Sequence, residues 1–263
     1  EKLRMCRRQA GMSQEKLAEK LGVSRQAITK WETGTGMPDI ENIMAISALF
    51  GVSIDELLSD GITNTPPSFV RAILKAASDP ANYRYSLGET AELTQAVQSW
   101  YKRRYGVELA ADELMAVYGS QEGLAHVGWT LCDPGDVVLV PDPGYPIFEL
   151  GPYLCGASCV RYPLLAEDHY LPDLERFDPD LAKKARFMVV SYPANPLGAA
   201  APDGFYPRLI EFAQKYEIAI LHDNAYSEII FDGRVGKSFL SFEGAKEVGV
   251  EFNSLSKTYN LTG

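Results

Sequence analysis

The sequence lacks several features that would assign a protein to a broad class. Its apolar runs stay well short of the roughly 18 residues of a membrane-spanning helix, and no signal-peptide pattern opens the chain. There are only four cysteines and three histidines. The cysteines form no paired CxxC units, and no histidine or acidic cluster accompanies Cys155 and Cys159, whose spacing alone suits metal binding. We therefore expect free thiols, no metal site, no membrane contact and a cytoplasmic location.

The charged residues are distributed unevenly along the chain. A net charge of −10 argues against non-specific coating of nucleic acid. Residues 1–31 nevertheless hold eight basic and three acidic residues, whereas residues 32–60 hold six acidic and no basic residues. A basic half beside an acidic half is an oriented charge distribution, which binding to a phosphate backbone requires.

Two segments of different character meet near residue 60. The first segment predicts short amphipathic helices, with Ser13, Ser24 and Asp39 as helix caps and a capping box at residues 53–56. A short turn-rich linker at residues 59–67 then predicts a domain boundary. The 263 residues, 46% of them hydrophobic, suffice for one large or two smaller domains, and we place the domains at residues 1–60 and 61–263.

The second segment alternates helices and strands. Helical patterns cover residues 68–77, 93–105 and 203–216. Short β-rich apolar runs cover residues 137–140, 187–191 and 218–222, and a further strand-like run precedes Lys257. Buried strands that alternate with helices predict a mostly parallel sheet covered on both faces. The expected fold class is therefore multidomain, an all-α bundle followed by an α/β domain.

The first segment contains a helix, a turn glycine at Gly22, a helix cap at Ser24 and a buried pair, Ile28 and Trp31, in register. This pattern resembles the helix-turn-helix of Cro and lambda repressor over about residues 1–60. The resemblance implies sequence-specific binding to double-stranded DNA, with the third helix in the major groove. It places Arg25, Gln26 and Lys30 at base edges with Thr29 beside them, and Gln14 at a phosphate. The alternative is a helical bundle whose exposed face is only solvated.

Four motifs of the second segment occur in a fixed order. They are PDPGYP at 141–146, NPLG at 195–198, DNAY at 223–226 and NSLSKTYNLTG at 253–263. In order and spacing they resemble the large domain of fold-type I, class I/II aminotransferases, over about residues 62–263. The sequences at 118–126 and 226–233 are similar to the LL-diaminopimelate aminotransferase subgroup. The resemblance implies pyridoxal 5'-phosphate (PLP) as cofactor, a homodimer and amino-group transfer between an amino acid and a 2-oxo acid, a biosynthetic reaction of EC 2.6.1 type.

The resemblance also implies a role for each residue of the cofactor site. Lys257 is the expected catalytic residue, which forms a Schiff base with the cofactor and carries a proton. Asp223 is expected to pair with the pyridine nitrogen, and Tyr145 to stack on the ring. The remaining cofactor-binding residues are expected at the ring oxygen (Asn195 and Tyr226) and at the phosphate (Ser120, Gln121, Ser254 and, from the neighbouring subunit, Tyr85). Tyr83 competes with Tyr85 for that last assignment.

Each of these residues also has an ordinary structural interpretation. Taken alone, Asp223 is a helix cap, Tyr145 a packing residue, Asn195 part of a turn and Lys257 a surface lysine. Their joint occurrence at the family spacing favours the cofactor site. The three histidines fit no catalytic pair, and we interpret them as solvated or core residues.

The family pattern continues beyond Gly263 with the closing strand of the large sheet, so the resemblance implies that the sheet of the α/β domain is incomplete here. An arginine that clamps the cofactor phosphate and a small domain that grips the substrate carboxylate are expected to follow that residue, so the 263 residues by themselves are not expected to turn over an amino acid. Because the first residue is glutamate rather than methionine, a further interpretation is that the sequence is an excerpt that starts within a longer protein. Three interpretations result: an aminotransferase fused to a DNA-binding module, a transcription regulator that senses PLP or an amino acid, and a fused gene product without a joint function.

Overall fold

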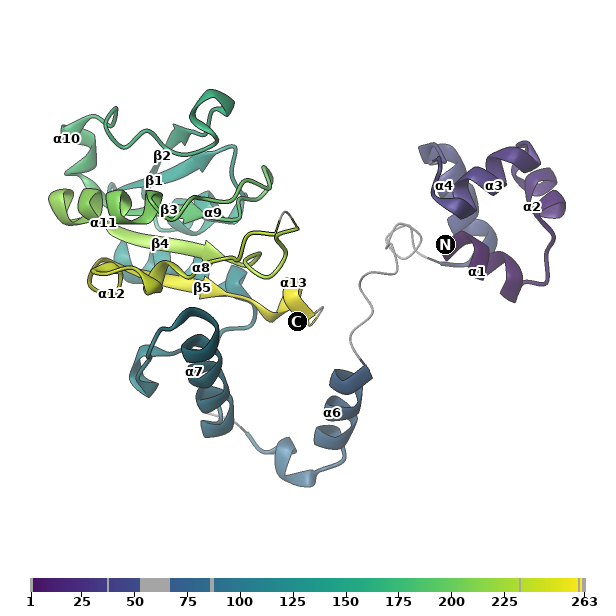
Figure 1. Ribbon diagram of the computed structural model, residues 1–263, viewed down its shortest axis with the longest axis horizontal. Coiled ribbons are helices and arrows are strands. Elements are labelled where there is room, and N and C mark those ends of the chain that lie inside the picture. The colour runs from purple at the N-terminus through teal and green to yellow at the C-terminus, as the bar shows by residue number, and fades with distance from the viewer. Residues whose placement is uncertain are drawn as a thin grey trace. The chain divides into compact units, whose positions relative to one another are not determined.

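The computed structural model describes residues 2–36, 38–52, 67–85, 88–231, 233–259 and 261 (Figure 1). The chain divides into two compact units, Glu1–Val70 and Arg71–Gly263. The predicted boundary between residues 60 and 61 and the predicted capping box at residues 53–56 lie outside the described residues. Within the described ranges, no helix has the length and apolar character to cross a membrane.

The first unit is a helical bundle. Among its described residues, the helices are α1 (Lys2–Gln9), α2 (Gln14–Leu21), α3 (Arg25–Thr33) and α4 (Ile40–Phe50). The three predicted caps are confirmed, because the side chains of Ser13, Ser24 and Asp39 each accept a hydrogen bond from a backbone N–H in the first turn of the following helix. Leu17 and Ile28 are fully buried in the core between these helices, and Trp31 packs against them.

A buried ion pair joins α1 to α3. Arg7 donates from Nη2 to Glu32 Oε2 at 3.0 Å and from Nε to the other carboxylate oxygen. The two side chains are 11% and 3% exposed. Burial acts to raise the pKa of Glu32, but the hydrogen bonds from Arg7 and Gln14 outweigh it and hold that pKa below its ordinary value.

The second unit contains a parallel five-stranded sheet of order β2-β1-β3-β4-β5. Its strands are β1 (Val137–Asp142), β2 (Ser158–Pro163), β3 (Ala185–Ser191), β4 (Ala219–Asn224) and β5 (Gly249–Asn253). The α-helices that accompany it are α7 (Ala91–Tyr105), α8 (Ser120–Leu131), α9 (Ile147–Leu154), α10 (Pro179–Ala182), α11 (Phe205–Tyr216), α12 (Ala245–Val248) and α13 (Leu255–Tyr259). Helix α6 (Pro67–Ala77) spans the division between the two units.

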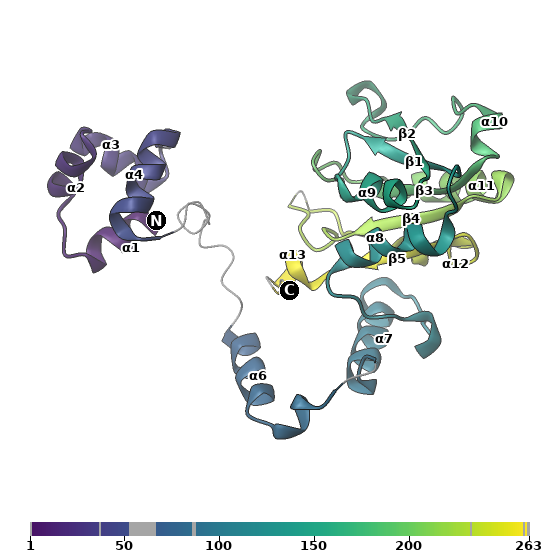
Figure 2. The same cartoon turned by 180° about the vertical axis from the view of Figure 1, so that it is seen from behind.

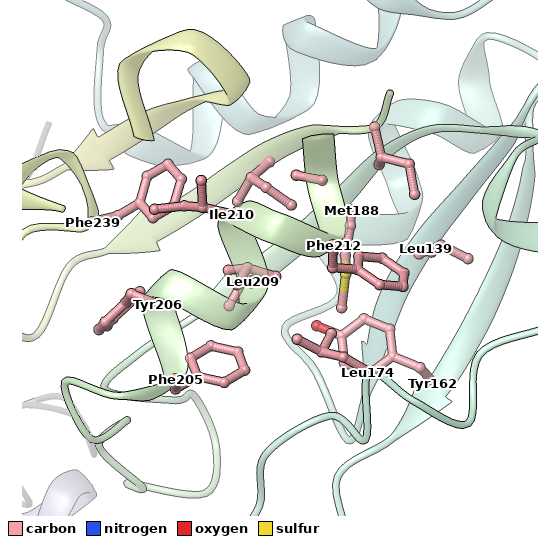
Figure 3. Packing of buried hydrophobic residues seen from close by; sticks show 14 of the residues in the cluster. Leu139, Tyr162, Leu174, Met188, Phe205, Tyr206, Leu209, Ile210, Phe212 and Phe239 are labelled. Atoms are coloured by element: carbon pink, nitrogen blue, oxygen red, sulfur yellow. The ribbon is translucent and has the colours of Figure 1, made fainter. Parts of the chain in front are cut away.

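Helices cover both faces of the sheet, as Figures 1 and 2 show from opposite sides. On one face, Leu209 and Phe212 of α11 pack over Leu139 and Met188 (Figure 3). On the other face, Leu124 of α8 and residues of α9 pack against alternate residues of the same strands, such as Val138 and Phe187. This alternation follows from the period of two along a strand, and it explains why the strands are apolar throughout.

The predicted strands of the second unit are confirmed, with one strand omitted. The three β-rich runs correspond to β1, β3 and β4, and the strand-like run before Lys257 corresponds to β5. Strand β2 was not predicted. It lies at an edge of the sheet, where only Tyr162 is buried and Arg161 is exposed, so its sequence carries little apolar signal.

Candidate cofactor and DNA-binding sites

Most of the residues expected at the cofactor lie at or just after the carboxyl ends of four strands. Because all five strands are parallel, these ends lie at one edge of the sheet. The strand order reverses between β1 and β3, and ligands of open α/β sheets bind at such a reversal. Tyr145 follows β1 and Asn195 follows β3, while Asp223 lies near the end of β4 and Lys257 follows β5.

The first turn of α8 lies beside the loop that follows β1. The Tyr145 hydroxyl donates to Gln121 Oε1 at 3.2 Å. Ser120 and Gln121 are the first two residues of α8, and Gly119 precedes them with a φ of 81°, a conformation that favours glycine. Backbone N–H groups in a first helical turn have no partner within the helix, so this end of α8 suits an anionic group.

Asp223 is the most deeply buried of the expected cofactor residues, at 5% exposed. Its Oδ2 accepts a hydrogen bond from the Ser191 hydroxyl at 3.2 Å. Its Oδ1 is buried and has no hydrogen-bond partner among the described residues. Burial raises the pKa of Asp223 above its ordinary value, and the charge of His222 and the Ser191 hydrogen bond oppose that rise. A buried acceptor without a donor is uncommon and indicates a place for a ligand donor.

Tyr226 lies close to both Asp223 and Lys257. The Lys257 Nζ is 5.8 Å from the centroid of the Tyr226 ring, within the range of a cation–π contact. Burial raises the pKa of Tyr226, and the nearby Asp223 and Tyr145 raise it further. Electrostatic interactions therefore connect Tyr226 with Tyr145 after β1, with Asp223 near the end of β4 and with Lys257 after β5. Lys257 itself is exposed.

The other expected cofactor residues are placed as follows. Asn195 is half-buried, and the Ser254 hydroxyl accepts a hydrogen bond from the Ser256 N–H at the start of α13. Tyr85 is 92% exposed and so makes little contact within its own chain. Its competitor Tyr83 is 74% exposed, and its hydroxyl donates to the Ala77 carbonyl.

Sequence reasoning missed a buried polar cluster next to this site. The side chains of His222 and Glu251 have no exposed surface, and His222 Nδ1 lies 3.1 Å from Glu251 Oε2. The three histidines were expected to be solvated or core residues, and His222 is a core residue, but its acidic partner was not singled out. The available signal was Glu251 itself, an acidic residue inside the apolar run that precedes Lys257. His126 and His169 are exposed, as expected of solvated histidines.

Two further features bear on ligand binding. A cavity of about 410 Å³ lies between Tyr206 of α11 and the loops around Pro193, Ala201 and Val235, and its lining includes none of the expected cofactor residues. The four cysteines are free, with Cys6 buried and the others partly buried. In the described part of the chain, no three His, Cys, Asp or Glu side chains are grouped as a metal site.

The side chains expected at DNA bases lie on one exposed face of α3. Arg25, Gln26, Thr29 and Lys30 are all exposed. Arg25 Nε is paired with Glu15 Oε1 at 3.0 Å. Gln14, at the start of α2, is held within the unit, because its amide donates to Glu32 at 2.8 Å and accepts from the Thr29 hydroxyl at 3.3 Å.

The chain is similar to known protein families and sequences along most of its length. Residues 48–263 match the family described as aminotransferase class I and II, and residues 3–57 match a helix-turn-helix family. An LL-diaminopimelate aminotransferase from Halothermothrix orenii is 44% identical over 228 residues, which cover 86% of this chain and 59% of that protein. One from Desulforudis audaxviator is 46% identical over 228 residues, which cover 85% of this chain and 58% of that protein. The chain thus spans less than two thirds of the length of these relatives.

Solved structures share the fold of the second unit. BacF from Bacillus subtilis in its substrate-bound form matches with a TM-score of 0.72 and 39% identity, over 75% of this chain and 50% of that one. An aminotransferase from Staphylococcus aureus matches with a TM-score of 0.72 and 33% identity, over 75% and 52% of the two chains. Cystalysin from Treponema denticola, at 21% identity and a TM-score of 0.68 over 75% and 50% of the two chains, shares the fold and contains PLP.

Proposed function

The chain belongs to the aminotransferase class I and II family, which is PLP-dependent, and we propose on that basis that its second unit binds PLP at the carboxyl edge of the sheet. The observation that carries the proposal is the buried Oδ1 of Asp223, which has no donor among the described residues. A protonated pyridine nitrogen would supply that donor and would keep Asp223 ionised. The residues present therefore fit this cofactor.

The other residues of the edge would hold the remaining parts of the cofactor. Tyr145 would lie on one face of the ring, with its hydroxyl on Gln121 at the phosphate end. Ser120, Gln121 and Ser254 would donate to the phosphate, and Asn195 and Tyr226 to the ring oxygen. Tyr85 would reach the phosphate of the neighbouring subunit, a role for which its exposure suits it.

In the whole protein we propose amino-group transfer between an amino acid and a 2-oxo acid. When bound, PLP supplies an electron-withdrawing ring that stabilises negative charge at the substrate α-carbon. Lys257 would attach the cofactor covalently, and its Nζ, once released when the substrate amine takes its place, would accept the α-proton. Tyr226, whose ring lies 5.8 Å from that nitrogen, would restrict its position. The named activity of the relatives favours a diamino acid as amino donor.

The proposed active protein is a homodimer. Large apolar side chains are exposed on the adjacent helices α8 and α9, with Trp129 61%, Tyr153 71% and Leu154 61% exposed. Apolar surface of this kind is more often found where two proteins meet than on an isolated monomer. Sedimentation of the chain, alone and with PLP, measures the association.

The first unit gives the protein a second proposed activity. A helix-turn-helix match suggests DNA binding, and the exposed face of α3 carries Arg25 and Lys30. We propose that Arg25, Gln26, Thr29 and Lys30 read bases of a double-stranded operator and that Gln14 lies at a phosphate. The joining of this unit to a PLP-type fold favours one alternative, a transcription regulator whose second unit senses PLP or an amino acid.

The experiment that tests cofactor binding titrates the purified chain with PLP and follows its visible absorbance. Borohydride reduction and peptide mass analysis then locate the modified lysine. We expect modification at Lys257, and its loss in Lys257→Ala. Lys237→Ala, at another exposed lysine, is the matched control and keeps the modification. Modification spread over several surface lysines, equal in Lys257→Ala, would reject the site.

A separate experiment distinguishes the enzyme from the regulator. Sequences selected from random duplexes are compared with scrambled ones for binding, with and without PLP and amino acids. Binding that changes with these ligands favours the regulator. Turnover by the protein from the complete gene, with DNA binding unaffected by them, favours the enzyme. Equal affinity for selected and scrambled duplexes rejects sequence-specific DNA binding.

A further inference from the structure

The buried pair of His222 and Glu251 lies directly behind the expected cofactor residue Asp223. His222 and Asp223 are consecutive on β4, so their side chains point to opposite faces of the sheet. In the pairing of β4 with β5, His222 is opposite Glu251 and Asp223 is opposite Phe252. One face of these two strands therefore carries a buried imidazole and carboxylate, and the other carries the carboxylate of Asp223.

Glu251 is held as a carboxylate by donors from three other elements. Its Oε1 accepts from the Tyr101 hydroxyl of α7 at 2.8 Å and from the Ser238 hydroxyl at 2.9 Å. Its Oε2 accepts from the Phe239 N–H at 2.8 Å. Burial acts to raise the pKa of Glu251, but the hydrogen bond and charge of His222, with the other donors, lower it below its ordinary value.

The ionised state of Glu251 fixes the orientation of His222. A carboxylate only accepts hydrogen bonds, so the His222 Nδ1 that lies 3.1 Å from it must carry a proton. The second ring nitrogen, Nε2, lies 3.4 Å from the Tyr206 hydroxyl of α11. Both nitrogens are thus engaged, and the ring is held beside the backbone of Asp223.

The other titratable groups around the cluster stay neutral in the ordinary pH range. They are Tyr101 and Tyr105 on α7, Tyr206 on α11 and Tyr226 after β4, and burial raises the pKa of each above its ordinary value near 10. Asp223 and Glu251 are therefore the two acidic members of this cluster whose charge bears on the cofactor site. Lys257, which faces Tyr226, is the nearby cation on the cofactor side.

We propose that His222 and Glu251 form a positioning pair for Asp223, in which His222 offsets the negative charge of Glu251 so that Asp223 stays ionised to receive the pyridine nitrogen. This inference rests on the proposed PLP site. Two uncompensated carboxylates on neighbouring strands would favour protonation of one of them, and the one without a full set of donors is Asp223. A protonated Asp223 would lose the charge that holds a protonated pyridine nitrogen.

The proposal predicts an order for the pH at which Asp223 titrates in different variants, and a packing role alone would not give this order. His222→Gln leaves Glu251 uncompensated, so Asp223 should titrate about one pH unit higher than in the unsubstituted chain. Adding Glu251→Gln removes the second carboxylate. In this double variant Asp223 should titrate at a pH between its values in His222→Gln and in the unsubstituted chain. It should remain above the unsubstituted chain, because the charge of His222 lowers the pKa of Asp223 more than the charge of Glu251 raises it.

The test is a pH titration of the Asp223 carboxyl carbon by NMR in the cofactor-free chain. The signal is assigned from its loss in Asp223→Asn. His126→Gln, the same substitution at an exposed histidine, is the control and leaves the titration unchanged. Equal titration of His222→Gln and the unsubstituted chain, or a double variant that titrates above His222→Gln, overturns the proposal. If His222→Gln does not fold, a double variant that titrates no higher than the unsubstituted chain also overturns it.

A second measurement separates this inference from the proposed cofactor site. The pH at which PLP affinity is half-maximal should move upward in His222→Gln and partly back in the double variant, in step with the NMR titration. If neither the variants nor the unsubstituted chain bind PLP, the proposed function fails. The order of the NMR titrations then still decides whether His222 and Glu251 control the charge of Asp223. If the Asp223 titrations follow the predicted order but the pH dependence of PLP affinity does not change with them, the role of the pair in cofactor binding is overturned.

Discussion

The Arg7 guanidinium and the Glu32 carboxylate meet by two hydrogen bonds inside the helical unit, across 25 residues of sequence. Arg7 also donates from Nη1 to the Met12 carbonyl, and Gln14 donates to Glu32. One ion pair therefore joins α1, the turn after it, α2 and α3. We therefore expect this pair to hold α3 in a fixed orientation.

Removal of one member of this pair should destabilise the helical unit strongly. Glu32→Ala leaves a buried guanidinium without its partner, and we expect a loss of about 3 kcal/mol in the free energy of unfolding. The double substitution Arg7→Met/Glu32→Leu leaves no unpaired charge and should recover most of the loss. Urea denaturation, followed by the fluorine NMR signal of fluorotryptophan at Trp31, measures both. A double variant less stable than Glu32→Ala would contradict this account.

Acid should weaken the same unit through Glu32. Its folded-state pKa lies below its unfolded value of about 4.3, so its contribution is fully present above that value and is lost as pH falls through the folded pKa. The stability difference between the unsubstituted chain and Glu32→Gln should be constant above about pH 5 and should shrink below about pH 4. The same Trp31 signal, recorded over this range, tests the expectation, which a pH-independent difference would refute.

Asp223 should have the opposite pH dependence. Burial raises its folded-state pKa above the unfolded value of about 3.9, so the stability it contributes is fully present below that value and is lost as pH rises through the folded pKa. Asp223→Asn should therefore stabilise the cofactor-free chain, and more so at pH 8 than at pH 5. Thermal unfolding at the two pH values measures the difference. Ser191→Ala, which removes the donor to Oδ2, should instead increase the loss at high pH.

DNA binding should depend on the release of Arg25 from Glu15. Arg25→Ala should reduce discrimination against a wrong base by about 1–3 kcal/mol at one operator position. Glu15→Gln should raise affinity by a few fold, because an exposed ion pair contributes little stability and its acid also repels phosphate. Binding to a selected and a scrambled duplex at several salt concentrations tests both substitutions. Lower affinity in Glu15→Gln would show that the pair supports α3 in its bound orientation.

Local signals in the sequence predicted most of the architecture. The caps Ser13, Ser24 and Asp39 each act within one helical turn, and the apolar runs of β1, β3 and β4 are continuous, so both are visible without tertiary information. Strand β2 was missed because only Tyr162 is buried in it. The expected cofactor residues came from family likeness, and their common position at one sheet edge follows from the parallel order.

The polar cluster could not be predicted in the same way. Glu251 meets His222 only through the pairing of β4 with β5, and it meets Tyr101 across 150 residues of sequence. Neither residue has a spacing that marks the contact. The unpartnered Oδ1 of Asp223 is likewise a property of the folded chain, because it depends on which donors the fold leaves out of reach.

The register of β5 limits which mutations the gene tolerates there. Glu251 faces the polar cluster, while Phe252 packs on the opposite face, where its ring would lie 2.8 Å from a Cβ added at Gly123. A one-codon insertion or deletion within residues 249–250 would exchange the two faces. It would drive a carboxylate into the apolar layer under α8 and a phenyl ring among hydrogen-bond donors. Length changes are therefore expected before α12 rather than within β5 or directly after it, so that Lys257 keeps a fixed count of residues from Glu251.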